Sequence, residues 1–198
     1  MKRAIFLVTS IQGIRKPTFL KQLLALINDH YEVAILFAMT NFDEVWQAKR
    51  EFNTINEREH LPSVRIITLG DVYADHSGIL LKDNDYLNID LTKFTSYESH
   101  TNRLKVTRYV DDTGNIIAET LFGDNQVRLH TILFDKNSRI IQINNYNQQD
   151  QLYGIEKCND DFVDESLLLN TKSELVFRFT NYVMSQKINY GVAETSLI

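Results

Sequence analysis

The sequence has little of what marks a secreted, membrane-spanning or nucleic-acid-binding protein. Its single cysteine, Cys158, has no partner for an internal disulfide, which favours a reducing compartment such as the cytoplasm. Lysine and arginine occur at most in adjacent pairs and the net charge is -5, so the concentrated positive potential that binds nucleic acid is missing. No apolar run approaches the roughly 18 to 20 residues of a membrane span. We therefore expect a cytoplasmic protein with no membrane span and no nucleic acid partner.

Glycine and proline are also scarce, at 7 and 2 residues, so long disordered or low-complexity stretches are not expected. At 198 residues the chain can form one large domain or one domain with an elaborate insertion. The basic pair Lys2-Arg3 and the apolar run after it resemble a signal peptide, but the run is short and ends by Thr9. A buried strand is the better interpretation.

Motifs for catalysis and metal binding are missing. The 5 histidines show no H-x-x-x-H spacing and there is no C-x-x-C, so solvated histidines are favoured over a metal site. Neither a nucleophile elbow nor a Walker loop occurs, and a lone cysteine is usually inert. Asp71, Asp75 and the cluster at 83–85 lack the spacing of a calcium loop and are interpreted as turn residues. We identify no catalytic residue and no metal ligand.

The chain opens with alternating apolar strands and helical patterns. Buried strands are predicted over residues 3–8, 33–39 and 64–69. Pro17 suits the first position of the helix between the first two strands, and Thr40 with Asn41 can cap the next helix. Short connections between alternating strands and helices are typical of a doubly wound parallel sheet with right-handed crossovers. Residues 1–78 are therefore predicted to form the first part of a Rossmann-like α/β domain.

Turn-forming clusters then recur at a nearly constant step. They occupy residues 111–115, 123–125, 135–138 and 147–150. Stretches rich in Val, Ile, Thr, Tyr and Phe flank each cluster, which predicts strand, tight turn and strand, repeated without a helix. The aspartates and asparagines of the turns have a structural explanation, because they tolerate positive φ and bind their own backbone. Residues 79–170 are thus predicted to be an antiparallel β-meander inserted into the α/β scaffold.

A helical pattern returns at Thr171–Glu174, which matches a capping box in which both side chains satisfy backbone donors at a helix start. An apolar stripe follows at helical spacing, made of Leu175, Val176, Phe179, Tyr182 and Val183. We expect this helix to pack on the Rossmann-like sheet and residues 190–198 to begin another strand there. Residues 171–198 are accordingly predicted to be the return helix and strand of that domain.

The loop after the first strand is the candidate ligand site, because open α/β sheets bind ligands where the carboxyl end of a strand faces a helix N-terminus. Only one glycine stands where a dinucleotide fold has G-x-G-x-x-G, so a nicotinamide or flavin cofactor is disfavoured. A plain connecting loop is the alternative interpretation. The candidate substrate-binding residues are Ser10, Gln12, Gly13, Arg15 and Lys16.

This order of elements resembles the N-terminal portion of bacterial GT-B glycosyltransferases of family 4. The resemblance covers nearly the whole chain and rests on Lys2–Thr9 with Gly13, on residues 103–115, on the turn at 134–139 and on the helix from Thr171. The nearest kin are the poly(glycerol-phosphate) α-glucosyltransferases of wall teichoic acid and the accessory-secretion glycosyltransferases that modify serine-rich adhesins. Where that family usually carries two adjacent glycines, this sequence has Gln12-Gly13.

The resemblance implies a function that the chain shares with another domain. In that family the N-terminal half handles the acceptor, the meander serves acceptor or partner contacts and oligomerisation, and a C-terminal half binds the UDP-sugar. We therefore expect the acceptor-side portion of a retaining UDP-sugar-dependent glycosyltransferase, acting on a cell-wall polymer or a protein and inactive alone. No cofactor is expected in this chain, and a UDP-sugar donor is expected for the full-length enzyme. The implied partners are the missing C-terminal donor-binding domain, the acceptor, and further copies joined through the β-meander.

Two other classes of function stay open. A non-catalytic interaction or oligomerisation module is the main alternative, since unpaired backbone groups at the edges of a meander invite strand addition. A small-molecule enzyme acting at the loop from Ser10 to Lys16 ranks third, because no acid, base or nucleophile is identifiable. A second Rossmann-like half downstream of Ile198 in the reading frame would favour the glycosyltransferase, and a natural stop codon would favour the interaction module.

Overall fold

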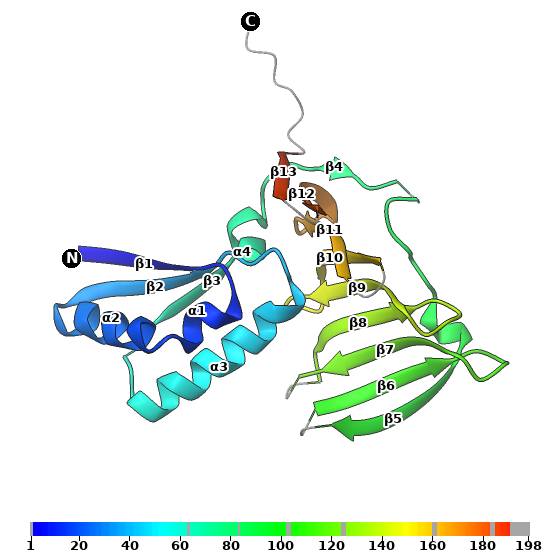
Figure 1. Cartoon of the computed structure of the whole chain (residues 1–198), viewed down its shortest axis with the longest axis horizontal. Helices are drawn as coiled ribbons and strands as arrows, with labels where there is room; N and C mark the ends of the chain where they lie inside the picture. Colours follow the sequence, from blue (N-terminus) through cyan, green and yellow to red (C-terminus); the bar gives the residue numbers. More distant parts are fainter. Residues whose placement is uncertain are drawn as a thin grey trace, which may run out of the picture. The chain divides into compact units, whose positions relative to one another are not determined.

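The structure is a computed structural model that describes residues 2–62, 64–82, 84–101, 104–123, 126–159, 162–182 and 185–190 (Figure 1). The chain divides into two compact units, Met1–Val72 (unit 1) and Tyr73–Ile198 (unit 2). Unit 1 is drawn in blue to cyan in Figure 1, and unit 2 follows in green to red. Each unit is described by itself below.

Unit 1 alternates strands and helices. Its elements are β1 (Lys2–Val8), α1 (Ile11–Arg15), α2 (Pro17–Asn28), β2 (Tyr31–Phe37), α3 (Asp43–Glu59) and β3 (Arg65–Thr68), with α4 (Leu69–Tyr73) at its end. The three strands form a parallel sheet in the order β1-β2-β3, in which Ile5 lies opposite Ala34 and Leu36 lies opposite Ile67. The prediction of a parallel α/β sheet is confirmed for this unit.

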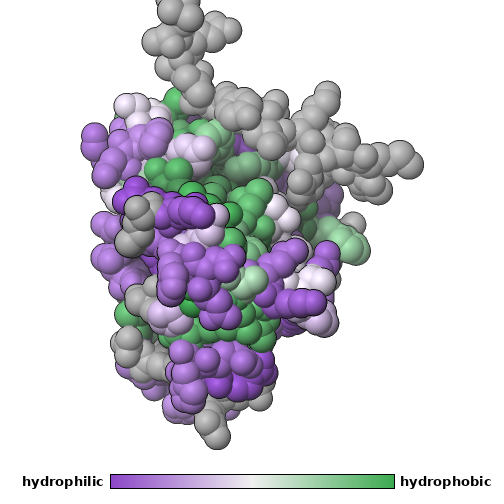
Figure 2. All heavy atoms as spheres, turned by 90° about the vertical axis from the view of Figure 1, so that its left-hand side faces the viewer, coloured by the Kyte–Doolittle hydropathy of each residue, from purple (hydrophilic) through white to green (hydrophobic). Residues whose placement is uncertain are grey.

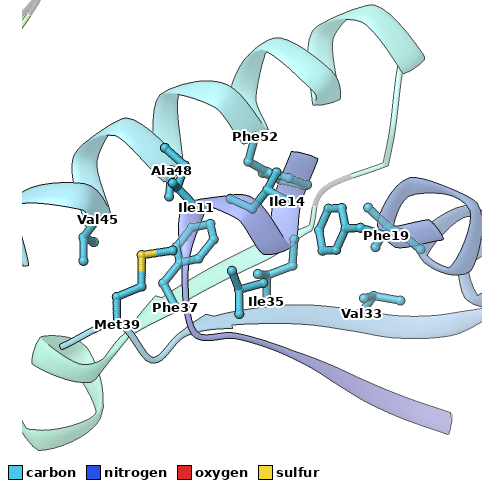
Figure 3. Close-up of a cluster of buried hydrophobic side chains, with 12 residues drawn as sticks. Ile11, Ile14, Phe19, Val33, Ile35, Phe37, Met39, Val45, Ala48 and Phe52 are labelled. Carbon is cyan, nitrogen blue, oxygen red and sulfur yellow. The ribbon is translucent and has the colours of Figure 1, made fainter. Parts of the chain in front are cut away.

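The core of unit 1 lies between one face of the sheet and the helices (Figure 3). Alternate residues of β2 supply the sheet side of this core, namely Val33, Ile35 and Phe37. Phe19 of α2 and Phe52 of α3 meet edge to face with ring centroids 6.4 Å apart. Pro17 takes the first position of α2, as predicted. Phe42 rather than Thr40 or Asn41 holds the N-cap position of α3, so the predicted cap is wrong.

Unit 2 is dominated by antiparallel strands. Its elements are β4 (Ile79–Leu80), the 3-10 helix η1 (Leu91–Lys93), β5 (Thr95–Thr101), β6 (Leu104–Val110), β7 (Ile116–Phe122), β8 (Arg128–Phe134), β9 (Ile140–Tyr146), β10 (Leu152–Asn159), β11 (Phe162–Leu169), β12 (Glu174–Tyr182) and β13 (Ser185–Tyr190). Strands β5 to β13 pair in sequence order, and β4 adds to β12. The predicted β-meander is confirmed.

Four hairpin turns of unit 2 share one hydrogen-bond pattern. Their first residues are Asp111, Asp135, Asn147 and Asn170, and each side chain accepts from the backbone N–H groups two and four positions later at 2.8 to 3.0 Å. The fourth residue of each turn has positive φ, between 60° and 89°. The structural role predicted for these polar residues is therefore confirmed, although the positive φ falls on the fourth position rather than the first. In the cluster at 123–125, residues 124 and 125 lie outside the described residues.

The predicted return helix is wrong, because residues 174–182 form strand β12. Asn170, one residue before the supposed capping box, binds the N–H groups of Lys172 and Glu174 and so closes a hairpin turn. Val, Phe, Thr and Tyr in the following stretch favour a strand, and pairing with β11 places Phe177 opposite Leu168. β12 and β13 therefore extend the antiparallel sheet and do not join the parallel one. Of the strand predicted at 190–198, residues 191–198 lie outside the described residues.

The segment between α4 and η1, called the connector below, covers part of the antiparallel sheet. Leu81 and Tyr86 of this connector pack against a small core of Ile155, Leu167, Leu169 and Leu175. Gln142 of β9 binds the connector like a short strand, because its side chain accepts from the N–H of Leu87 at 2.7 Å and donates to the carbonyl of the same residue at 2.9 Å. Asn170 adds a bond from its Nδ2 to the carbonyl of His76 at 2.7 Å. Polar side chains thus hold the connector on the sheet.

Candidate functional site

The carboxyl edge of the parallel sheet is the candidate site, because three chain segments leave the strands there. β1 continues into α1, β2 into the segment before α3, and β3 into α4. The N–H of Ala38 donates to the carbonyl of Val8 at 2.8 Å, which keeps the ends of β1 and β2 side by side. Ligands of open α/β sheets bind at this edge.

The segment predicted as a loop from Ser10 to Lys16 is mostly a short helix. α1 spans Ile11–Arg15, and its buried residues Ile11 and Ile14 anchor it to the core. Ser10 is extended at the N-cap position but makes no side-chain capping bond. Gln12, Arg15 and Lys16 are exposed, whereas Ser10 and Gly13 are half-buried. The five candidate residues are thus brought together on one short element.

Gly13 has no special backbone role. Its φ is not positive, and an added Cβ would meet only Val8 Cγ1 at an ordinary distance of 3.5 Å. The backbone N–H of Gly13 donates to the carbonyl of Ser10 at 2.9 Å, within the first turn of α1. The glycine is therefore not required by the geometry of this turn.

Arg15 is engaged with α3. Its Nε donates to Glu51 Oε2 at 2.9 Å and its Nη2 donates to Oε1 of the same carboxylate at 2.5 Å, a two-bond fork. The hydrogen bond from Arg15 holds the pKa of Glu51 below its usual value, and the same bond raises the pKa of Arg15. Both cations predicted for this segment are exposed, and Arg15 in addition ties α1 to α3.

A carboxylate from α3 reaches the start of α1. Glu44 Oε2 accepts a long bond, 3.4 Å, from the N–H of Ile11. Burial raises the pKa of the neighbouring Asp43, and the charge of Glu44 raises it further. A carboxylate of the protein therefore occupies the position beside the first turn of α1 where the sequence predicted a substrate contact.

Lys49 and Asp71 complete the edge. Burial lowers the pKa of Lys49, and the nearby charge of Asp71 partly offsets this. Asp71 was predicted to be a turn residue but lies in α4, where its Oδ2 accepts from the N–H and the hydroxyl of Thr68 at 2.8 and 2.7 Å. Within the described part of the chain Lys49 makes no ion pair. A half-buried amine of this kind can contact an anion or a hydroxyl group.

Sequence reasoning missed Asp43, Glu44 and Lys49, because nothing in their local pattern separates them from the solvated face of a helix. The crossover from β2 to α3 is what brings Glu44 beside α1 and Lys49 near Asp71 of α4. Among the described residues, no three His, Cys, Asp or Glu side chains are grouped so that they could hold a metal ion. No helix in the same residues is long and apolar enough to span a membrane.

Comparison with known proteins points to one fold. No protein-family model and no curated protein matches the chain. The solved structure of a mutant of S. aureus TarM in complex with fondaparinux, α-GlcNAc-glycerol and UDP matches 91% of this chain and 41% of its own, with 13% identity and a TM-score of 0.51. The GtfA/B complex bound to UDP and GlcNAc matches 95% of this chain and 39% of its own, with 11% identity and a TM-score of 0.51.

The two matched proteins are glycosyltransferases, and at this level of identity the likeness shows the fold alone. The predicted resemblance to poly(glycerol-phosphate) α-glucosyltransferases and accessory-secretion glycosyltransferases is confirmed in that sense. This chain spans about two fifths of the length of the chains it matches. A parallel α/β unit followed by an antiparallel meander is therefore a combination that occurs within larger glycosyltransferases.

Proposed function

We propose that this chain is the acceptor-side portion of a retaining UDP-sugar-dependent glycosyltransferase that acts on a cell-wall polymer or a protein, and that it is inactive alone. The observation that carries the proposal is the fold likeness over 91% and 95% of the chain to two proteins whose structures hold UDP. Because the chain spans about two fifths of those proteins, donor binding and the catalytic groups are assigned to a separate donor-binding domain. Because nucleotide sugars are found in the cytoplasm, we propose the cytoplasm as the compartment of this protein.

The carboxyl edge would hold the acceptor in this proposal. Ser10 and Lys16 offer a hydroxyl and an ammonium group at the two ends of α1, and Gln12 and Gly13 offer an amide and a backbone group within it. Lys49 contributes a half-buried amine from α3. Hydroxyl-rich or phosphate-bearing polymers are matched by such groups, since hydroxyls exchange hydrogen bonds and phosphates pair with ammonium ions. Arg15 acts indirectly, by fixing α1 against Glu51.

A titration of the ¹⁵N-labelled chain with oligo(glycerol phosphate) and, separately, with a serine-rich peptide tests the acceptor assignment. We expect one of the two to shift the amide signals of Ser10, Gln12 and Gly13, and Lys16→Ala to weaken that binding several-fold. Lys21→Ala is the matched control, because Lys21 is also exposed but lies on α2. Shifts that avoid α1, or equal losses from both variants, would remove the carboxyl edge from the acceptor site.

Calorimetry with UDP tests the division of labour. We expect no binding of UDP at micromolar concentrations and no sugar transfer from a UDP-sugar to either acceptor. Binding at micromolar strength by the chain alone would contradict the proposal that the donor site belongs to another domain.

A β-meander interaction or oligomerisation module is the second candidate, favoured by strand β5. β5 pairs with β6 over seven residues without a register shift, whereas most other pairs of the sheet contain a bulge. Tyr97 at its middle is 61% exposed. A straight edge without a bulge invites addition of another strand. Sedimentation at 10 to 100 µM should reveal oligomers that Tyr97→Lys dissociates, and a monomer at all these concentrations would reject self-association through β5.

A further inference from the structure

The amino edge of the parallel sheet in unit 1 carries a cavity of about 260 Å³, called the amino-edge cavity below. It lies where α2 ends and β2 begins, beside the segment that leads from α3 into β3. Figure 2 views the molecule from the side on which β1 begins, and hydrophobic surface shows there between hydrophilic side chains. The cavity is lined by Ile27, His30, Tyr31, Val33, Pro62 and Val64.

Aliphatic side chains form the walls of the amino-edge cavity. Ile27 comes from the last turn of α2, Val33 from β2, and Val64 from the position before β3. Val33 is only 6% exposed and belongs to the core of unit 1, and Ile27 and Val64 pack against that core. The cavity is thus a gap in the core that opens at the edge of the sheet, and it favours an apolar group.

The rim of the cavity carries hydrogen-bond donors. Tyr31 lies on the same face of β2 as Val33, and Lys2, its partner in the register, extends the same side of β1. Lys2 Nζ stands 5.3 Å from the centroid of the Tyr31 ring. His30 donates its N–H to the carbonyl of Ile27 at 3.0 Å, which also satisfies a carbonyl at the negative end of α2. A phenol and an imidazole therefore line the opening, with an ammonium group over the phenol ring.

Charge at the rim favours an anion. Lys2 is exposed and makes no ion pair within the described part of the chain. Glu32 also lines the cavity, but its position alternates with Tyr31 and points to the other face of β2. There its Oε2 accepts from Arg3 Nε at 3.0 Å. An ammonium group without a paired carboxylate attracts a negatively charged ligand group.

We infer that the amino-edge cavity binds a small carboxylate with an apolar body. The volume of about 260 Å³ is the share of roughly nine water molecules in the liquid, which gives room for a ligand of about ten non-hydrogen atoms. The carboxylate meets Lys2 and the hydroxyl of Tyr31, and the apolar body lies against Val33 and Val64. The inference rests on unit 1 alone and does not depend on the proposed function.

Three probes of one shape test the site. 3-Phenylpropionate, 3-phenylpropan-1-ol and 3-phenylpropylamine carry a carboxylate, a hydroxyl and an ammonium group on the same apolar body. Each is titrated into the ¹⁵N-labelled full chain and followed through the amide signals of Ile27, Tyr31 and Val33. We expect 3-phenylpropionate to shift these signals and to bind about tenfold more tightly than the alcohol, because only the carboxylate pairs with Lys2. The amine should bind most weakly.

Variants on the two faces of β1 locate the charge. Lys2→Gln should reduce the affinity for 3-phenylpropionate to that for the alcohol and leave the affinity for the alcohol unchanged. Arg3→Gln is the matched control, because it removes a cation at the next position, on the other face of the strand, and should leave both affinities unchanged. Val64→Phe fills the cavity and should weaken binding of both probes at least tenfold. Emission of Trp46 in unit 1 checks that each variant is folded.

Equal binding of the three probes, or an equal loss of affinity for 3-phenylpropionate in the Lys2 and Arg3 variants, would overturn the inference. So would signal shifts confined to amides outside residues 27–33 and 64, or no binding of any probe at about 10 mM. Because none of these measurements involves UDP, a glycosyl acceptor or α1, their failure is distinguishable from failure of the proposed glycosyltransferase.

Discussion

At the scale of single residues, the glycines of this chain differ in what the structure demands of them. Gly13 lies in a helical turn where a Cβ would touch only Val8 Cγ1 at 3.5 Å. At Gly78 a Cβ would lie 2.7 Å from the carbonyl oxygen of Leu175 and 2.8 Å from Glu174 Cβ. The glycine that resembles a ligand-binding motif is thus the replaceable one, and the one in the connector of unit 2 is not.

Gly13→Ala is expected to stabilise unit 1 by about 0.5 to 1 kcal/mol, because alanine lowers the entropy of the unfolded chain and favours helix. Urea unfolding followed by the emission of Trp46, the only tryptophan, measures this change. Gly78→Ala is the comparison and should destabilise unit 2, because backbone must move to admit the methyl group. Destabilisation by Gly13→Ala would show that the turn after β1 needs a glycine after all.

His130 of β8 should make the stability of unit 2 depend on pH. Burial lowers the pKa of His130 from 6.5 to about 4, and the charge of Glu119 opposes the shift only in part. The folded state therefore favours the neutral imidazole, and the unfolded state binds more protons between these two values. The contribution of His130 to the unfolding free energy is fully present above pH 6.5. It is lost as the pH drops towards 4, and the loss is on the order of 3 kcal/mol.

His130→Gln removes the titrating group and should flatten the profile between pH 4 and 6.5. The urea midpoint of the sheet signal in circular dichroism, taken at several pH values, measures the slope. His100→Gln replaces an exposed histidine of β5 and serves as the control. A slope that persists in the His130 variant would place its origin in another group.

At the scale of elements, the hairpins of unit 2 repeat one turn with different residues at the left-handed position. Gly114 holds it between β6 and β7 with φ 89°, whereas Ser138 holds it between β8 and β9 with φ 61°. Left-handed backbone costs a residue with a Cβ roughly 1 to 2 kcal/mol, and costs glycine little. Backbone strain is therefore greater in the turn that contains Ser138 than in the turn that contains Gly114.

Exchanging the two residue types should reveal this difference. Ser138→Gly is expected to stabilise unit 2 by up to about 1 kcal/mol, since relief of strain exceeds the added freedom of the unfolded chain. Gly114→Ser should destabilise it by about 1 kcal/mol. Chemical denaturation monitored by circular dichroism gives both values, and changes of the same sign would show that the two turns do not share one geometry.

Local signals explain which elements were predictable from sequence. The meander was found because its turns are local and repeat, and the parallel strands because their apolar runs are unbroken. The stretch after Thr171 was misjudged, because its T-x-x-E pattern fits a capping box as well as a hairpin turn opened by Asn170. Pairing with β11 decides between the two, and that contact is invisible in a local window. For the same reason the sequence selected the segment from Ser10 to Lys16 as a candidate site but did not indicate that Glu44 lies beside it.

At the scale of the whole molecule, the chain carries two separate cores. Phe52, 1% exposed, lies in the core of unit 1, and Leu167, fully buried, lies in that of unit 2. Trp46 reports on unit 1, and the circular dichroism of the strands is dominated by the larger sheet of unit 2. Two probes can therefore follow the two units in one sample.

We expect the two probes to give separate urea transitions, with Trp46 emission changing first, because the described part of unit 1 has only three strands and leaves Ile5 and Leu7 of β1 exposed. Phe52→Ala should lower the unfolding free energy of unit 1 by about 3 to 5 kcal/mol, which shifts the Trp46 transition to less urea and leaves the sheet transition in place. Leu167→Ala should lower the unfolding free energy of unit 2 by about 2 to 5 kcal/mol, which shifts the sheet transition and leaves the Trp46 transition in place. If each substitution moved both transitions together, the units would unfold as one cooperative body, and the two cores would not be energetically separate.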